Sequence, residues 1–328
     1  MKIFLSHSRE MRQGFYSDRA INRLRRIAEV VLHDGAEPIR PDALAKVAQD
    51  VDIIISDRRT EAPASVFAAS SRLRAFLRCA VDIRNIDTAA ASDAGILVTQ
   101  APVTFQTSVS ELALGYMVDL SRGISRHAAA NWAGGQYQPR MGRELGGSVV
   151  GIIGFGSIGR KLARVCLSLD MTVLVNDPFI VVDDPQIEQV ELFDLLGRAH
   201  FVICLVVAND ETENLISQAE FAAMRPDAVF INLSRGGLVD DAALVAALRE
   251  GRIAGAALDV GRGPDQRPLP EIAALPNVVA TPHIGGFTQA AAEGQALATV
   301  AQARAILAGE VPDGAVNAAN WTRRRVDG

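Results

Sequence analysis

The chain has 328 residues, enough for about two domains that each bury a core of their own. Its 49% apolar and 22% charged residues are the proportions of an ordinary globular protein. A net charge of −5 gives no electrostatic attraction to nucleic acid or to an acidic membrane surface. No apolar run approaches the roughly 20 residues that cross a bilayer. We therefore expect a protein that binds neither nucleic acid nor membrane.

The N-terminus and the cysteines indicate the compartment. The chain begins with an apolar core of only three residues, Ile3 to Leu5, which is too short for a signal peptide. Cys79, Cys166 and Cys204 are far apart and form no metal-binding or redox spacing. We expect a cytoplasmic protein with no metal site.

Apolar runs alternate with helical patterns along almost the whole chain, which predicts parallel α/β architecture. In the first hundred residues the expected strands are 2–6, 51–56, 75–78 and 96–99. A helix is expected between the first two strands. Asp18 would cap its start and Gly35 would end it, and the residues on its apolar face would be Leu24, Ile27, Val31 and Leu32.

A longer helix is expected over 107–126, followed by a loop rich in glycine and arginine over 134–147. The second half predicts a strand from Val149 and further strands at 172–175, 201–207, 228–233, 253–258 and 278–280. The expected helices there are 161–169, 240–250 and 289–307. Because the last helix follows the final strand, we expect it to return to the first domain, which would make that domain discontinuous.

The segment from Val149 to Asp177 carries the strongest motif. An apolar strand leads into Gly154-x-Gly156-x-x-Gly159, a helical pattern follows, and a second strand ends on an acid. Gly154 permits a tight turn, Gly156 lets the backbone approach a pyrophosphate, and Gly159 lets the helix pack closely on the sheet. The diphosphate would lie on the N–H groups at the start of the helix. The flanking strands and the acid about 20 residues on favour a dinucleotide site over a glycine-rich packing turn.

Asp177 indicates which dinucleotide binds. A carboxylate at the end of the second strand accepts hydrogen bonds from the adenosine ribose and repels a 2′-phosphate. Pro178 and Phe179 follow, so no arginine is present there to hold such a phosphate. The sequence predicts NAD rather than NADP. The cofactor contacts expected from this motif are Gly154, Phe155, Gly156, Ser157, Ile158, Gly159 and Asp177.

Polar residues directly after the later strands are candidates for the chemistry, because ligands bind at the carboxyl ends of parallel strands. Arg235, Asp259 and His283 each follow such a strand. An arginine is unfavourable at a positive helix end, so a bound anion explains Arg235 better than a surface role. Asp259 could equally be a helix or turn cap, and His283 alone could be structural.

Together these residues fit hydride transfer to or from a hydroxy acid. The reaction needs a cation for the substrate carboxylate and reacting oxygen, and a group that moves the hydroxyl proton. Arg235 can supply the first as a planar bidentate donor, and His283 can supply the second near neutral pH. The hydride chemistry belongs to the cofactor.

With these motifs, the chain resembles the D-isomer-specific 2-hydroxyacid dehydrogenases, the group that contains phosphoglycerate dehydrogenase and glyoxylate/hydroxypyruvate reductase. The resemblance covers nearly the whole chain. The matching stretches are 96–102, 108–111, 150–159, 232–240, 255–260, 275–278 and 281–286. It implies two Rossmann-like or flavodoxin-like parallel-sheet domains with an active-site cleft between them. Residues 1–101 and 287–328 would form the discontinuous substrate-binding domain, and residues 102–286 the NAD-binding Rossmann domain.

The resemblance also implies roles for single residues. Arg235 would bind the substrate carboxylate, His283 would be the acid/base, and Asp259 would bind the nicotinamide amide. Backbone N–H groups of a loop at 79–82 would hold the substrate carboxylate, through Cys79, Ala80 and Val81. The expected cofactor set further includes Val207, Leu233, Ser234, His283 and Gly285. Family members usually dimerise through the dinucleotide domain, which predicts a homodimer that uses the 100–147 region.

The departures from the family pattern lie at positions expected to bind the substrate or to assist the histidine. The family places a glutamate, paired with the histidine, five residues after the aspartate. Here Pro264 occupies that position and Asp265 follows it, so Asp265 is a candidate substitute, although a solvated loop residue is an equal interpretation. The carboxylate-binding loop has Ala80 and Asp82 where glycines are usual, and Phe105 replaces a polar residue.

We predict an NAD-dependent oxidoreductase that interconverts a small 2-hydroxy acid and its 2-oxo acid. One alternative is the formate-dehydrogenase-like branch, which carries a glutamine beside its histidine; Gln266 lies two positions too late for that role. The other alternative is an NAD-sensing regulatory protein on a dehydrogenase scaffold. Loss of Arg235 or His283 would indicate such a protein, and both residues are present.

Overall fold

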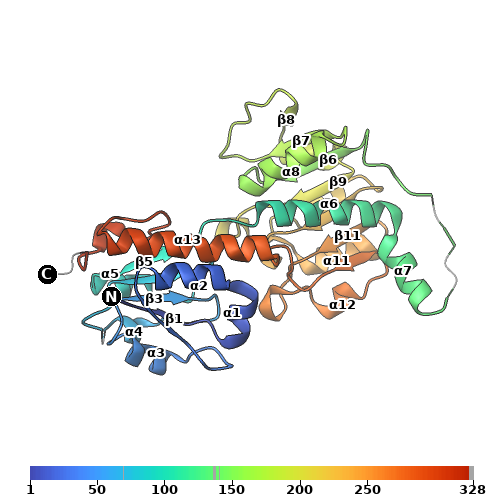
Figure 1. Ribbon diagram of the computed structural model, residues 1–328. Helices are drawn as coiled ribbons and strands as arrows, with labels where there is room; N and C mark the ends of the chain where they lie inside the picture. Colours follow the sequence, from blue (N-terminus) through green and yellow to red (C-terminus); the bar gives the residue numbers. More distant parts are fainter. Residues whose placement is uncertain (69, 136–137, 140, 325–328) are drawn as a thin grey trace. The chain divides into compact units, whose positions relative to one another are not determined.

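The protein is described from a computed structural model that covers residues 1–68, 70–135, 138–139 and 141–324. The chain divides into two compact units. The first consists of Met1–Thr104 together with Thr288–Gly328, and the second of Phe105–Phe287. Figure 1 follows both units along the chain, with the last segment, in red, beside the blue N-terminal elements.

In its described part, the first unit contains a five-stranded parallel sheet with the order β2-β1-β3-β4-β5. The strands are β1 (Lys2–Leu5), β2 (Glu29–Leu32), β3 (Ile53–Ser56), β4 (Ala75–Arg78) and β5 (Leu97–Gln100). The helices are α1 (Arg9–Phe15), α2 (Asp18–Arg25), α3 (Pro41–Val47), α4 (Ala64–Ala68), α5 (Thr88–Asp93) and α13 (Gln289–Leu307), with the short turn η4 (Ala318–Asn320).

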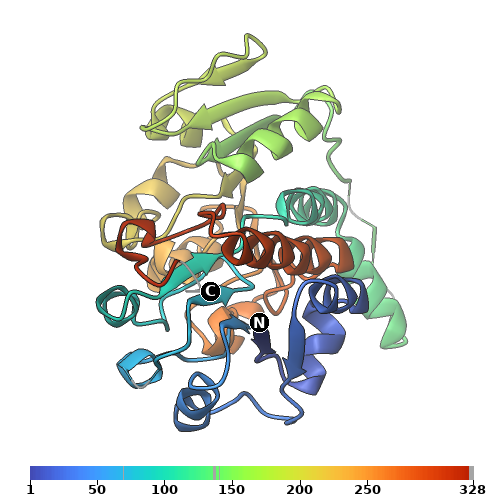
Figure 2. The same ribbon diagram turned by 60° about the vertical axis from the view of Figure 1, so that its left-hand side comes forward.

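Helices cover both faces of this sheet. On one face, Ile21 and Leu24 of α2 and Val300 and Ile306 of α13 share a core with the sheet, and Figure 2 shows these two helices next to each other. On the other face, a second core is formed with α3, α4 and α5. The strands read as nearly continuous apolar runs because both of their faces are buried.

The predicted helix from Asp18 to Gly35 is wrong in its second half. The helix α2 is capped by Ser17, whose hydroxyl accepts from the N–H of Ala20, and it ends at Arg25. Val31 and Leu32 belong to β2, which pairs in parallel with β1 as the edge strand. The β-branched Val30-Val31 pair packs well on a pleated surface, so the available sheet edge overrides the helical spacing of the apolar residues.

The described part of the second unit contains a seven-stranded parallel sheet with the order β12-β11-β10-β9-β6-β7-β8. Its strands are β6 (Val149–Ile153), β7 (Thr172–Asn176), β8 (Ile187–Gln189), β9 (Phe201–Cys204), β10 (Val229–Asn232), β11 (Gly255–Leu258) and β12 (Val278–Ala280). Its helices are α6 (Gln106–Arg122), α7 (Ile124–Trp132), α8 (Ser157–Leu167), α9 (Leu192–Arg198), α10 (Gln218–Ala223), α11 (Asp241–Arg249) and α12 (Pro270–Ala273). The short turns are η1 (Asp210–Thr212), η2 (Gly236–Leu238) and η3 (Pro264–Gln266).

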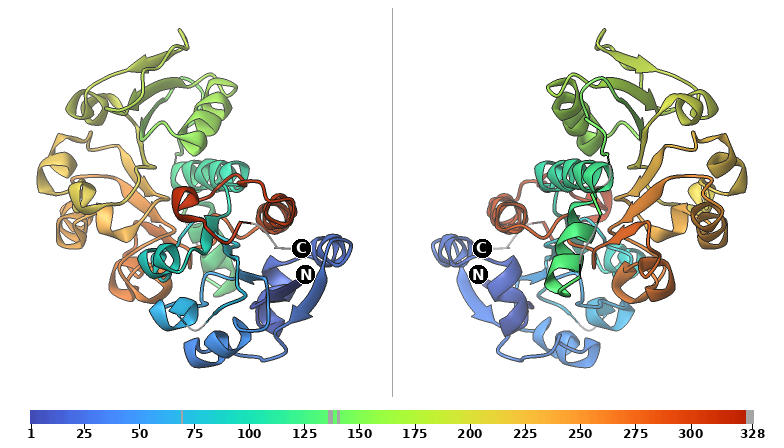
Figure 3. Two further views of the ribbon diagram at one scale, coloured as in Figure 1. Left: turned by 90° about the vertical axis from the view of Figure 1, so that its left-hand side faces the viewer. Right: turned by 90° about the vertical axis from the view of Figure 1, so that its right-hand side faces the viewer.

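Two separate cores sandwich this second sheet. Helices α6 and α8 pack against one face, and α9, α10, α11 and α12 pack against the other. Both views in Figure 3 show this arrangement, with the green helices on one side of the sheet and the yellow and orange helices on the other. The predicted α/β fold with two parallel sheets is thus confirmed.

The long helix predicted over 107–126 is interrupted. Helix α6 ends at Arg122, its C-cap Gly123 has a left-handed backbone with φ 66°, and α7 begins immediately after it. Glycine adopts this conformation without a side-chain clash, so it lets the chain change direction. Helix α6 buries one apolar face, which carries Val109, Ala113, Tyr116 and Met117. The predicted loop at 134–147 lies partly outside the described residues.

Candidate active site

The glycine-rich turn follows β6, the strand in the middle of the second sheet. Gly154 has a left-handed φ of 96°, and a side chain there would come within 2.8 Å of the Leu205 backbone. A side chain at Gly159 would overlap the carbonyl oxygen of Gly154. In contrast, a Cβ at Gly156 would meet no atom within 4 Å. The fold therefore requires Gly154 and Gly159, whereas Gly156 keeps open the space in front of the turn.

The start of α8 fits a bound diphosphate. Gly156 is the N-cap residue and offers no side-chain acceptor to the first N–H groups of the helix. These groups and the positive end of the helix dipole suit an anion. The guanidinium of Arg160 lies 4.8 Å from the centre of the Phe155 ring at the same turn. Arg160 lies four residues after Gly156, still in the first turn of the helix, and was not among the residues predicted from the sequence.

Asp177 lies at the end of β7, the strand beside β6. Its two carboxylate oxygens accept backbone hydrogen bonds, one from Phe155 N at 2.8 Å and one from Phe179 N at 2.9 Å. These bonds hold the carboxylate against the glycine turn. Ionised carboxylates accept about four hydrogen bonds, so ribose hydroxyls could still be bound there. The position agrees with the role predicted for Asp177.

Arg235 follows β10 in an extended conformation, just before η2. The turn is built by Asn232, whose amide donates to the carbonyl oxygen of Arg235 at 2.9 Å and whose side-chain oxygen accepts from Ser234 N at 3.0 Å. The Arg235 side chain is half-buried, and its Nη1 donates to the Ser234 carbonyl oxygen at 2.7 Å. Its backbone position is therefore fixed by a buried asparagine.

Other predicted cofactor residues lie at the same edge of the sheet. Val207 follows β9 and is 79% exposed, whereas Leu233 is buried beside Arg235. The Ser234 hydroxyl donates to the carbonyl oxygen of Val206, which links the segments after β9 and β10. The strand order puts the ends of β7, β6, β9 and β10 next to one another along this edge.

Asp259 is buried at the end of β11 and organises the loop that carries His283. Its carboxylate accepts from the Thr281 hydroxyl, from Ile284 N at 2.7 Å and from Gly285 N at 2.7 Å. The Tyr116 hydroxyl bonds to Thr281 in turn, and burial raises the pKa of Tyr116 so that it stays neutral. Asp259 thus caps a turn, the alternative that the sequence left open. The nicotinamide contact of Asp259 and of Gly285 stays a prediction.

His283 is half-buried and has a left-handed φ of 61°, which is uncommon for a residue with a side chain and is typical of functional sites. Its backbone N–H donates to the Thr281 carbonyl oxygen. Its ring Nδ1 lies 3.3 Å from an oxygen of Asp265, and that oxygen is the main-chain carbonyl rather than the carboxylate. The structure thus brings Asp265 to His283 through the backbone.

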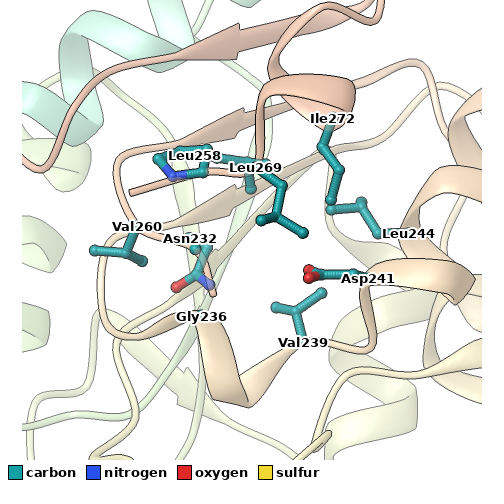
Figure 4. A pocket seen from close by; sticks show the side chains of 11 residues that line it. Asn232, Gly236, Val239, Asp241, Leu244, Leu258, Val260, Leu269 and Ile272 are labelled. Atoms are coloured by element: carbon teal, nitrogen blue, oxygen red, sulfur yellow. The ribbon is translucent and has the colours of Figure 1, made fainter. Parts of the chain in front are cut away.

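The loop 261–267 after β11 packs against the Arg235 turn. A side chain at Gly236 would overlap the backbone of Gly261, so the two segments touch through their main chains. Beneath them is a pocket of about 10 Å³, shown in Figure 4, where Asn232 and Asp241 lie among leucine and isoleucine side chains. It is far too small for a substrate. Burial in this region raises the pKa of Asp241.

The predicted carboxylate-binding loop belongs to the first unit. The N–H of Cys79 donates to the Ser56 carbonyl oxygen at 2.8 Å, so this group already has a backbone acceptor. Among the described residues, the N–H groups of Ala80 and Val81 have no backbone acceptor. The buried Arg78 holds the base of the loop, since its guanidinium donates to the carbonyl oxygens of Asp57 and Thr60. Ala80 and Val81 remain predicted substrate contacts.

Comparison with known proteins identifies the family. The model described as D-isomer specific 2-hydroxyacid dehydrogenase, NAD binding domain, matches residues 114–285, more than half of the chain. The chain belongs to the D-isomer specific 2-hydroxyacid dehydrogenase family. Its membership of that family and NAD as its cofactor, both predicted from the sequence, are confirmed.

Similar proteins span different lengths. The chain is 32% identical over 314 residues to a D-3-phosphoglycerate dehydrogenase of Methanocaldococcus jannaschii, with 94% of this chain but 59% of that protein covered. It is 32% identical over 316 residues to a glyoxylate reductase of Thermococcus onnurineus, with 92% and 93% covered. The structure of a D-lactate dehydrogenase from Sporolactobacillus sp is similar with a TM-score of 0.81 and 30% identity, covering 97% and 99% of the two chains.

Two further findings concern ligands and membranes. Within the described residues, no group of three or more His, Cys, Asp and Glu side chains is arranged to hold a metal ion. None of the helices in that same part of the chain combines the length and the apolar character that a membrane span needs.

Proposed function

We propose that the protein is an NAD-dependent dehydrogenase that interconverts a small D-2-hydroxy acid and its 2-oxo acid. The observation that carries this proposal is the order of residues along one edge of the second sheet. The ends of β7, β6, β10, β11 and β12 carry Asp177, the glycine turn, Arg235, Asp259 and His283 in that spatial order. A dinucleotide lying along this edge would have its adenosine at Asp177 and its nicotinamide near Arg235 and His283.

The residues at this edge of the sheet would have different roles in the reaction. NADH, when bound, supplies the hydride. Arg235 would bind the substrate carboxylate and withdraw charge from the reacting carbonyl oxygen. His283 would donate a proton to that oxygen during reduction and accept it back during oxidation. Asp259 fixes the loop that presents His283, and the asparagine at 232 fixes the turn that presents Arg235.

The comparisons support the enzyme rather than either alternative. The relatives reported above are named as dehydrogenases and a reductase, and both Arg235 and His283 lie at the cofactor edge, as an enzyme requires. A formate-dehydrogenase-like reaction would need a glutamine side chain beside His283. Gln266 lies two positions later than the glutamine of that branch, and the His283 Nδ1 contacts the main-chain carbonyl oxygen of Asp265.

A panel of 2-oxo acids tests the proposal. The purified chain is mixed with NADH and with glyoxylate, hydroxypyruvate, pyruvate or a longer 2-oxo acid, and NADH absorbance is followed. We expect turnover of at least one of them and of its D-hydroxy acid in reverse, with the L-isomer inert. His283→Ala with normal NADH binding is the matched control. NADH binding without turnover of any member of the panel would instead favour a sensing protein.

We also propose a cytoplasmic homodimer. Helix α7 has no buried residue among those described, and it exposes Ile124 by 53% and Trp132 by 87%. Such apolar surface is typical of an interface. Light scattering after gel filtration should give twice the chain mass for the parent, and less for a Trp132→Glu variant if α7 takes part.

The cysteines bear on the proposed cytoplasmic location. The thiols of Cys79, Cys166 and Cys204 are all free and buried, which agrees with a reducing compartment.

A further inference from the structure

We propose that the main-chain carbonyl of Asp265, rather than its own carboxylate, positions His283 for proton transfer. The proposal rests on the acid/base role given to His283 in the proposed function. It makes Asp265 a positioning residue through its backbone, and it explains how the site can operate with Pro264 at the position of the family glutamate.

The first support is the contact itself. The Asp265 carbonyl oxygen lies 3.3 Å from His283 Nδ1. A carbonyl oxygen can only accept a hydrogen bond, so this contact requires the proton on Nδ1. The proton that is exchanged with a substrate is then carried by Nε2. A partner at Nδ1 fixes both the tautomer and the orientation of an imidazole ring.

The second support is the backbone conformation that presents this oxygen. Asp265 and Gln266 are consecutive left-handed residues, with φ of 55° and 60°. The loop closes on itself, because Gln266 N donates to the Gly263 carbonyl oxygen at 3.0 Å and Gly261 N donates to that of Gln266 at 2.8 Å. Aspartate tolerates the left-handed region better than most residues. The backbone conformation therefore accounts for an aspartate at this position without any role for its charge.

The third support is the anchoring of the loop. Arg262 donates to Glu213 at 2.7 Å and to the Asn214 side chain at 2.6 Å, and it reaches the carbonyl oxygens of Gly237 and Val239, both at 3.1 Å. It thereby ties the Asp265 loop to the turn that carries Arg235. The side chain of Asp265 itself is exposed.

The two possible partners differ in charge, which makes them distinguishable. A carboxylate would stabilise the imidazolium and raise the pKa of His283, whereas a carbonyl orients the ring and adds no net charge. Removing the Asp265 carboxylate should therefore leave the pKa of the acid/base group in place. Displacing the Asp265 main-chain carbonyl should reduce turnover, whereas removing the Asp265 carboxylate should not.

The test compares Asp265→Asn with Asp265→Pro. Asparagine removes the charge and keeps the left-handed backbone, whereas proline fixes φ near −65° and so moves the carbonyl. We expect kcat for 2-oxo acid reduction to fall further in D265P than in D265N, by up to about 10²-fold, because the imidazole is no longer held in place. The KM for NADH should stay the same in both, and the pKa of the pH profile should be the same in D265N as in the parent. NADH binding and thermal unfolding verify that D265P is folded.

A spectroscopic measurement keeps the test independent of turnover. The ¹⁵N shifts of a labelled His283 in the neutral ring should show the proton on Nδ1 in the parent and in D265N, and a mixture of tautomers in D265P. A D265N variant with an acid-shifted pH profile would overturn the proposal in favour of the carboxylate. A D265P variant with parental kcat and parental tautomer would also overturn it. If no 2-oxo acid is reduced, the proposed function is wrong. The tautomer of His283 then still tests whether its Nδ1 donates to the Asp265 carbonyl oxygen.

Discussion

The side chain of Arg235 leaves the end of β10 half-buried, with one nitrogen on the Ser234 carbonyl oxygen and its backbone held by Asn232. We predict that Arg235→Ala lowers kcat/KM for 2-oxo acids by on the order of 10²–10³, because an oriented charge at the reacting carbonyl is lost. NADH affinity, measured by fluorescence titration, should hardly change. Arg235→Lys should recover little, since an ammonium cannot bind a carboxylate bidentately.

Arg252→Ala provides a matched control for Arg235. Arg252 is exposed, whereas Arg235 is half-buried, and it precedes β11 and so lies at the opposite, amino edge of the sheet. Its kcat/KM should equal that of the parent. An Arg235→Ala enzyme that kept most of its kcat/KM would exclude Arg235 from the reaction.

Asp177 is the residue that should select the cofactor. Its carboxylate is held by Phe155 N and Phe179 N where it would face the ribose of the adenosine. We predict that the parent strongly prefers NADH and that Asp177→Ala narrows the NADH/NADPH ratio of kcat/KM by about tenfold, which corresponds to 1.4 kcal/mol of relieved repulsion. The Asp177→Asn variant keeps a hydrogen-bond acceptor but removes the negative charge, so it measures the effect of the charge alone. Equal use of both cofactors by the parent would contradict this role.

At the scale of elements, the turn between β6 and α8 contains two kinds of glycine. A methyl group at Gly156 would meet no protein atom, whereas one at Gly159 would overlap the Gly154 carbonyl. We predict that Gly156→Ala weakens NADH binding at least tenfold with little change in melting temperature, because the methyl group enters the diphosphate space. Gly159→Ala should instead lower the melting temperature of the apoprotein, since the helix must move off the sheet. Calorimetry and NADH titration of both variants separate the two effects.

The elements also show where local patterns suffice. The expected helix 289–307 coincides with α13, because Thr288 caps it and no strong β-former run competes. The expected strands 75–78 and 278–280 coincide with β4 and β12. The helix predicted for residues 29–32 was wrong, because the spacing of its apolar residues fits a helix while its composition fits a strand. The edge of β1, which is not visible locally, decided between them.

At the scale of the whole molecule, a buried histidine predicts how stability depends on pH. His7 follows β1 and is 1% exposed, with its ring edge-on to Tyr16 at 5.0 Å. Burial lowers the pKa of His7 to about 4, with Asp57 opposing the shift and Arg78 and Arg12 adding to it. The folded protein therefore keeps His7 neutral, while the unfolded chain protonates it near pH 6.5.

The sign of the dependence follows from these two values. Between pH 6.5 and 4 the unfolded chain binds the extra proton, so the free energy of unfolding falls as the pH falls, by about 3 kcal/mol at most. Urea unfolding at several pH values should show this slope in the parent and lose it in His7→Leu. His200→Asn removes a second histidine whose pKa burial lowers, but His200 is only half-buried, so this variant should keep most of the slope. An unchanged slope in His7→Leu would contradict the assignment.

The amino-acid sequence was enough to predict the parallel α/β fold, the dinucleotide turn with Asp177, and the strand ends that carry Arg235, Asp259 and His283. These features depend on glycine conformation, on runs of apolar residues and on polar residues placed directly after them, all of which are local. Which side chains and backbone atoms contact each other follows from the three-dimensional arrangement of the chain. It showed Asp259 holding the His283 loop, Cys79 donating to Ser56, and a main-chain oxygen of Asp265 at His283. Such contacts join residues distant in sequence and depend on backbone direction, which side-chain patterns do not record.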